Sequence, residues 1–143
     1  MKKLLILSMV ISAITFAESE GNKMEIEVKV IRPLTIEVIQ HIDLGEMVAG
    51  TNGSGKGVFT VKGEPEETYY TYIKELGKEK EEGIIKLLDE ENSLDVALEI
   101  DIDENEINEN GKNEHVVKAD IKIPKDQLSG KYEGEITLAL RYE

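Results

Sequence analysis

The strongest constraint on the fold is an alternation of side chains through residues 130–143. With a period of two, an extended chain places alternate residues on opposite faces. One face carries Gly130, Tyr132, Gly134, Ile136, Leu138, Leu140 and Tyr142, and the other is mostly polar or charged. The pattern predicts a terminal β-strand with its apolar row on a core. A strand at the edge of a sheet can also pair with a strand from another molecule.

The first residues predict a secretory signal. Lys2 and Lys3 precede a mostly apolar run of 13 residues, 4–16, and Ala17 follows. Such a run fits a signal peptide, whereas a membrane-spanning helix needs about 20 residues. We therefore expect a cleaved signal at residues 1–17, a single domain at 18–143, and no stable membrane span after cleavage. The expected location is the periplasm, the outer surface or a fimbrium.

Composition excludes some partners. The formal net charge is −13, and removal of Lys2 and Lys3 makes it −15, so the mature surface repels the phosphates of nucleic acids. The chain has no cysteine, although an exported domain of this size could have used disulfides. Its stability is therefore expected to come from the core alone.

Shorter alternating runs predict further strands. The first is a half-buried strand with Met24, Ile26, Val28 and Val30 on one face. Pro33 interrupts the ladder, and further strands are expected at residues 34–38, 58–61, 68–73, 84–88, 94–102 and 115–123.

Turns and loops separate these strands. A Gly-rich turn is expected at residues 50–57, a helical turn or solvated loop at 74–83, and a hairpin loop at 103–114 with Asn110 and Gly111 at its tip. Eight or nine short strands predict an all-β, two-sheet antiparallel sandwich with immunoglobulin-like topology.

Two segments resemble known ligand-binding motifs, but each lacks residues that the motif requires. Residues 50–57 (GTNGSGKG) match a P-loop except at the last position, where Gly57 replaces the Ser or Thr that holds Mg²⁺, and a strand rather than a helix follows. Asp101, Asp103 and Asn105 have the spacing of the first calcium ligands of an EF-hand. Glu106, however, stands where an EF-hand requires Gly, and Lys112 stands where it requires the bidentate Glu. A looser carboxylate site that uses Glu104, Glu106 or Glu109 stays open.

Nothing in the sequence nominates a catalytic centre. His41 and His115 have no Cys or His at metal-ligand spacing, and both are expected to be structural. Ser54, Ser93 and Ser129 lie in no nucleophile motif. We expect no enzyme, no cofactor and no metal.

Four segments, in order, carry a resemblance to a known family. They are residues 32–36 (RPLTI), 43–50 (DLGEMVAG), 59–65 (FTVKGEP) and 130–137 (GKYEGEIT). Together they resemble the family of domain of unknown function 4402, small exported β-sandwich proteins similar to spore coat protein U and to the fimbrial subunits of chaperone–usher systems. Such pilins have Gly at the fourteenth position from the end and a penultimate aromatic, which are Gly130 and Tyr142 here. The chain departs from the commonest pilins in lacking a disulfide.

The resemblance implies a structural subunit of a surface fibre that assembles by β-strand addition. The implied partners are other fimbrial subunits or further copies of the chain, and possible assembly factors are a periplasmic chaperone and an usher. The donor strand would use Met24, Ile26, Val28 and Val30. The C-terminal strand would use Gly130, Tyr132, Ile136, Leu138, Leu140 and Tyr142.

Two other classes stay open. Residues 24–30 could instead be the first strand of a self-sufficient monomer, a binding or adhesion module that recognises a glycan or protein through loops 50–57 and 103–113. An exported hydrolase is the third class, and it predicts turnover that fails when single acidic or histidine residues are changed.

Overall fold

The computed structural model describes residues 21–77, 79–101 and 105–143. The chain divides between Val30 and Ile31. We call residues 21–30 the extension and residues 31–143 the body. The expected signal peptide, residues 1–17, lies outside the described residues.

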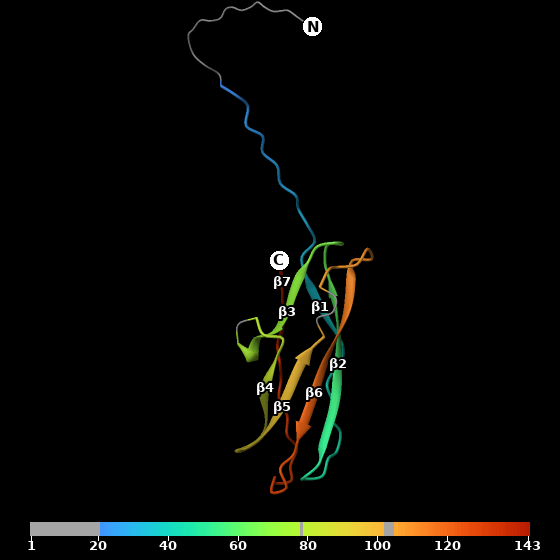
Figure 1. Cartoon of the computed structure of the whole chain (residues 1–143), viewed down its shortest axis with the longest axis vertical. Coiled ribbons are helices and arrows are strands. Elements are labelled where there is room, and N and C mark those ends of the chain that lie inside the picture. Colours follow the sequence, from blue (N-terminus) through green and yellow to red (C-terminus); the bar gives the residue numbers. More distant parts are fainter. Residues whose placement is uncertain (1–20, 78, 102–104) are drawn as a thin grey trace, which may run out of the picture. The chain divides into compact units, whose positions relative to one another are not determined.

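The described part of the body contains seven strands and one turn of 3-10 helix (Figure 1). In chain order they are β1 (Thr35–Gln40), β2 (Asn52–Lys62), β3 (Tyr69–Ile73), η3 (Lys74–Leu76), β4 (Glu82–Asp89), β5 (Asn92–Ile100), β6 (Lys112–Lys122) and β7 (Leu138–Tyr142). Five of the strands that the sequence predicts correspond to β1, β3, β4, β5 and β6, and the strand predicted at residues 58–61 lies within β2. Across the described residues, no helix has the length and apolar character to span a membrane.

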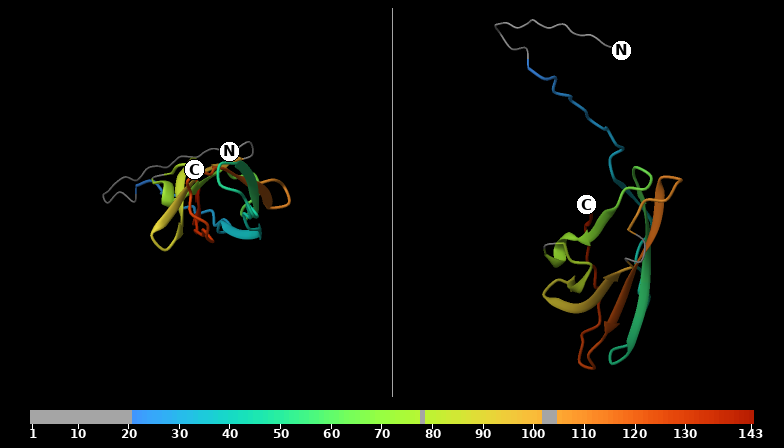
Figure 2. Two further views of the ribbon diagram at one scale, coloured as in Figure 1. Left: turned by 90° about the horizontal axis from the view of Figure 1, so that it is seen from below. Right: turned by 45° about the horizontal axis from the view of Figure 1, so that its top comes forward.

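The strands form two antiparallel sheets. The larger has the order β1-β2-β6-β5-β4, and the smaller pairs β3 with β7. The prediction of an all-β, antiparallel fold is therefore confirmed, with seven described strands instead of eight or nine. The strands of the body surround a common interior, which is seen end-on in Figure 2.

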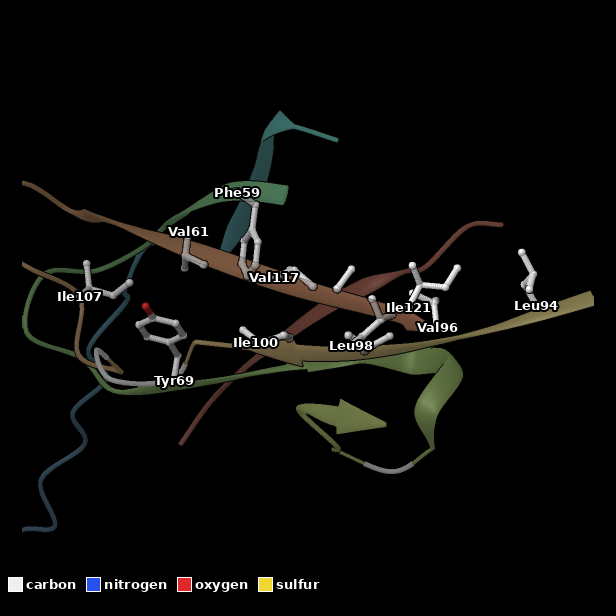
Figure 3. Packing of buried hydrophobic residues seen from close by; sticks show 12 residues of the cluster. Phe59, Val61, Tyr69, Leu94, Val96, Leu98, Ile100, Ile107, Val117 and Ile121 are labelled. Atoms are coloured by element: carbon white, nitrogen blue, oxygen red, sulfur yellow. The ribbon is translucent and has the colours of Figure 1, made fainter. Parts of the chain in front are cut away.

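The interior holds a single apolar cluster. Alternate residues of the central strands are buried: Phe59 and Val61 from β2, Val96, Leu98 and Ile100 from β5, and Val117, Ala119 and Ile121 from β6. Tyr69 of β3 faces them from the smaller sheet, and Ile107 closes one end (Figure 3). Ile73 of β3 belongs to the same cluster. Since the chain has no disulfide, this cluster is the main source of stability.

The expected Gly-rich turn at residues 50–57 is wrong. Only its first residues turn, and Asn52 already pairs with Lys122, so that the glycines belong to β2. Gly53, Gly55 and Gly57 lie on the inner face of β2. Because these residues have no side chains, residues 40–47 pack directly against the backbone of the strand. A Cβ on Gly55 would lie 3.0 Å from Leu44 Cδ2 and 3.1 Å from the Asp43 carbonyl oxygen.

The expected continuous strand at residues 130–143 is also only partly right. Tyr132, Ile136, Leu138, Leu140 and Tyr142 pack against the core as the alternation predicts, but the regular ladder is limited to β7. Residues 130–134 contact β4 instead, and a bridge joins Leu88 to Glu133. Gly130 and Gly134 allow this approach, because a Cβ on Gly134 would lie 2.9 Å from Leu87 Cδ2, and one on Gly130 would overlap the Asp89 carboxylate.

Candidate assembly site

The extension carries a row of exposed apolar side chains. Residues 21–30 form no strand or helix and all are exposed. The apolar side chains have exposed fractions of 89% for Met24, 95% for Ile26, 81% for Val28 and 87% for Val30. The prediction of a half-buried strand here is therefore wrong, as is the alternative that these residues are the first strand of the domain. The alternating pattern implied a buried face, whereas these apolar side chains are exposed.

Strand β7 has one paired edge and one open edge. It pairs with β3 in a register that sets Leu140 opposite Thr71. The Lys74 N–H donates to the Thr137 carbonyl at 2.9 Å, and the Glu143 N–H donates to the Thr68 carbonyl at 3.1 Å. In an antiparallel ladder the intervening residues point their backbone groups the other way.

It follows that Ile136, Leu138, Leu140 and Tyr142 direct their N–H and C=O groups away from β3. For Ile136, Leu138 and Leu140, the described residues supply no partner on that side. We call this row of backbone groups, from Ile136 to Tyr142, the open edge. The same residues place their side chains against the core, so the edge combines free hydrogen-bonding groups with an adjacent apolar surface.

The neighbouring edges are covered by the body itself. On β3, the Tyr69 N–H donates to the Asn105 carbonyl at 2.9 Å, and the Ile73 N–H donates to the Lys80 carbonyl at 3.0 Å. On β4, Leu88 exchanges two hydrogen bonds with Glu133. Because exposed edges invite pairing with other chains, proteins usually cover or interrupt them. The open edge of β7 therefore differs from the edges of β3 and β4.

A second segment with unpaired backbone follows β1. Residues 41–47 make no backbone–backbone hydrogen bond within the described chain, and the Gly45 N–H is satisfied by the Asp43 carboxylate at 2.8 Å. Ile42, Leu44 and Met47 nevertheless rest on the core over the β2 glycines. Strand β1 has β2 on one side and no strand on the other. The larger sheet therefore also ends in an unpaired edge.

Tyr142 joins the end of the open edge to the start of the body. Its hydroxyl donates to the Arg32 carbonyl at 2.6 Å and accepts from the Glu64 N–H at 2.8 Å. The Arg32 N–H donates in turn to the Glu64 carboxylate at 3.0 Å. Arg32, near the start of the body, is therefore held beside Tyr142 of β7.

The solvent side of β7 carries charged groups. The Arg141 guanidinium bonds the Glu79 carboxylate at 2.5 Å and lies 4.7 Å from the Tyr70 ring centroid. The hydrogen bond that Arg141 donates to the Glu79 carboxylate raises the pKa of Arg141 above its already high value. The Glu75 carboxylate accepts from the Thr137 N–H at 2.6 Å and hydroxyl at 2.8 Å. The first of these bonds is the main reason why the pKa of Glu75 is lowered.

The other sequence candidates do not gather into a site. Lys56 of the P-loop-like segment is an exposed residue of β2, and β2 is followed by a turn rather than a helix. Asp103 and Glu104 lie outside the described residues. Among the residues that are described, no group of three or more His, Cys, Asp or Glu side chains could hold a metal ion. His41 is exposed, and so are Ser54 and Ser129.

His115 belongs to a buried polar network that the sequence does not reveal. Its Nε2 lies 2.5 Å from the Tyr69 hydroxyl and its Nδ1 lies 2.9 Å from the Asp101 carbonyl. Asn113 donates to the Tyr69 hydroxyl at 2.9 Å and to the Glu106 carbonyl at 2.6 Å. This network secures both ends of the loop between β5 and β6, which is a structural role.

Comparison of the chain with protein-family models, curated proteins and solved structures finds no match.

Proposed function

We propose that the protein is an exported structural subunit of a surface fibre, with an immunoglobulin-like, pilin-like fold, and that subunits join when the extension of one copy binds the open edge of the next. The observation that carries the proposal is that one chain has both an exposed row of alternating apolar side chains at residues 24–30 and an unpaired strand edge. The resemblance of four segments to pilin-like proteins supports it, as does the expected signal peptide.

The mechanism is strand addition. Backbone hydrogen bonds to Leu138 and Leu140 supply affinity, and alternate side chains of the extension cover the apolar surface beside the edge. Four such side chains contribute about 1.5 to 3 kcal/mol each when fully buried, on the order of 6 to 12 kcal/mol before the cost of ordering the extension.

The geometry of this contact leads to a fibre. The surface used by the donor differs from the surface used by the acceptor, so each bound copy still offers one of each. A head-to-tail contact that does not close on itself produces a filament.

Deletion of residues 18–31 tests the proposal. We expect the mature chain to form a ladder of oligomers on an unboiled gel and the deleted chain to remain monomeric. Identical monomers from both chains would contradict the proposal and favour a monomeric binding module.

A matched pair of point variants distinguishes the loss of strand pairing from an effect of shortening the chain. Val28→Asn places a polar side chain in the apolar row, whereas Glu27→Asn places the same residue on the opposite face. We expect the first variant to weaken the ladder strongly and the second to leave it nearly unchanged. Equal effects would show that the alternating face plays no part.

A further inference from the structure

The charges on the solvent side of the C-terminal segment differ between its two ends. This inference rests on the proposed function and concerns which way the incoming strand runs. Glu135 lies at one end of the open edge and Arg141 at the other, and both are exposed. The residues between them on that side, Thr137 and Ala139, are uncharged. The solvent side of this segment therefore has Glu135 at one end and Arg141 at the other, where Arg141 is ion-paired with Glu79 and followed by Glu143.

The extension carries a matching asymmetry. The residues between its apolar positions are Glu25, Glu27 and Lys29, so the acidic groups come first and the basic group last. The four apolar residues of the extension equal in number the inward residues Ile136, Leu138, Leu140 and Tyr142. If all four apolar residues of the extension lie opposite the four inward residues, only one register is possible for an antiparallel strand and only one for a parallel strand.

The two directions bring different charges together. In the antiparallel register Met24 lies opposite Tyr142 and Val30 opposite Ile136. This sets Glu25 directly opposite Arg141 and Lys29 diagonal to Glu135, and both pairs attract. In the parallel register Lys29 lies beside Arg141, where two cations repel.

We infer that Arg141 and Glu135 select the direction of binding, so that the extension of a second copy lies antiparallel to β7 with Glu25 beside Arg141. Glu79 and Tyr70 hold the guanidinium in place from the β3 side. Arg141 donates from Nε and Nη2 to the Glu79 carboxylate and from Nη1 to the Tyr142 carbonyl. Since a guanidinium has five N–H donors, donors remain for a second carboxylate.

The absence of native cysteine allows a direct test by disulfide trapping between two single-cysteine variants of the mature chain. Glu27→Cys on the donor and Ala139→Cys on the acceptor lie opposite each other in both registers, so this pair tests strand addition alone. Lys29→Cys lies opposite Thr137→Cys in the antiparallel register only, and Glu25→Cys lies opposite it in the parallel register only. In the antiparallel register, positions 27 and 139 and positions 29 and 137 form non-hydrogen-bonded pairs, whose Cα spacing of about 4.5 Å suits a disulfide.

We expect the mixed 27–139 dimer to form, and the 29–137 dimer to exceed the 25–137 dimer about fivefold at low salt, equivalent to about 1 kcal/mol. The excess should shrink as salt screens the charges. Equal or reversed yields, with the 27–139 dimer present, would overturn the inference and leave the proposed function standing. Loss of the 27–139 dimer from folded protein would overturn both.

Charge-reversal variants provide a second test in the same disulfide-trapping experiment. Arg141→Glu in the Thr137→Cys acceptor should remove the excess of the 29–137 dimer, and Glu25→Lys on the Lys29→Cys donor should restore its yield. An unchanged ratio with Arg141→Glu would show that Arg141 does not select direction. A chain with both Glu27→Cys and Ala139→Cys, trapped at high dilution, reports whether a chain fills its own edge.

Discussion

At the scale of single residues, the hydroxyl of Tyr142 has the most specific role. It is the only group of that side chain that can hydrogen-bond, and it satisfies backbone groups of Arg32 and Glu64. The aromatic ring packs on the core independently of these bonds. Removal of the hydroxyl therefore isolates the two hydrogen bonds from the packing.

We expect Tyr142→Phe to lower the free energy of unfolding by about 0.5 to 1.5 kcal/mol, because the Glu64 N–H and the Arg32 carbonyl lose a partner at a partly exposed site. Urea denaturation measures this loss. Tyr70→Phe is the matched control, since no described hydrogen bond involves the Tyr70 hydroxyl, and it should change stability by less than about 0.5 kcal/mol. Similar losses in the two variants would contradict the assignment.

Glu75 makes stability depend on pH in the acidic range. Its pKa is lowered from the ordinary value of 4.5, mainly by the hydrogen bond from the Thr137 N–H. A carboxylate with a lowered folded-state pKa stabilises the protein above its unfolded pKa, and this contribution is lost as the pH falls through the folded pKa.

Glu75→Gln should therefore be less stable than the natural chain near neutral pH, and the difference should shrink as the pH falls below 4.5. Urea denaturation at several pH values measures the trend. Glu82→Gln, at an exposed position with no described ion pair or side-chain hydrogen bond, should show no such trend. A Glu75→Gln difference that is independent of pH would disprove the linkage.

At the scale of elements, alternation predicts the strands that have a polar outer face and an apolar inner face, such as β5 and β6. It fails for the first half of β2, because a run of Gly53, Gly55 and Gly57 has the composition of a turn. The structure shows why glycine is needed there, since residues 40–47 rest on the strand where side chains would stand. That requirement comes from a segment ten or so residues earlier, and local pattern does not contain it.

Gly55→Ala tests this account of β2. The added Cβ would meet the Asp43 carbonyl oxygen at 3.1 Å, which is backbone and cannot rotate aside. We expect a loss of about 1 to 3 kcal/mol of stability from overpacking. Ser54→Ala, one residue away on the exposed face, should be nearly neutral. Equal stability of the two variants would show that residues 40–47 yield easily.

The candidate site was predictable only in part. The alternation identifies Met24, Ile26, Val28 and Val30 as one row and Leu138 and Leu140 as part of another, but it cannot tell a covered row from a bare one. Exposure depends on which strands pair. The same holds for the polar network, because Tyr69 and His115 are 46 positions apart in the chain and meet only through the sheet register.

At the scale of the whole molecule, the proposal makes the body an incomplete fold. Anything that binds the folded body but not the unfolded chain raises its apparent stability. A synthetic peptide of residues 18–31 should therefore stabilise the chain that lacks these residues.

We expect this peptide, added at about 100 times its dissociation constant, to raise the free energy of unfolding by about 2.7 kcal/mol, seen as a higher Tm. The control peptide carries Asn in place of Ile26 and Val28 and should have little effect. A Tm that responds equally to both peptides, or to neither, would argue against strand addition.

The contact between Tyr142 and Arg32 has a practical consequence for anyone who labels this protein. A fluorophore or affinity tag fused after Glu143 would emerge next to the root of the extension, where it can crowd an approaching subunit. The hairpin tip between β4 and β5, at Glu90 and Glu91, is exposed and remote in sequence from both segments, and it is the better position for a reporter.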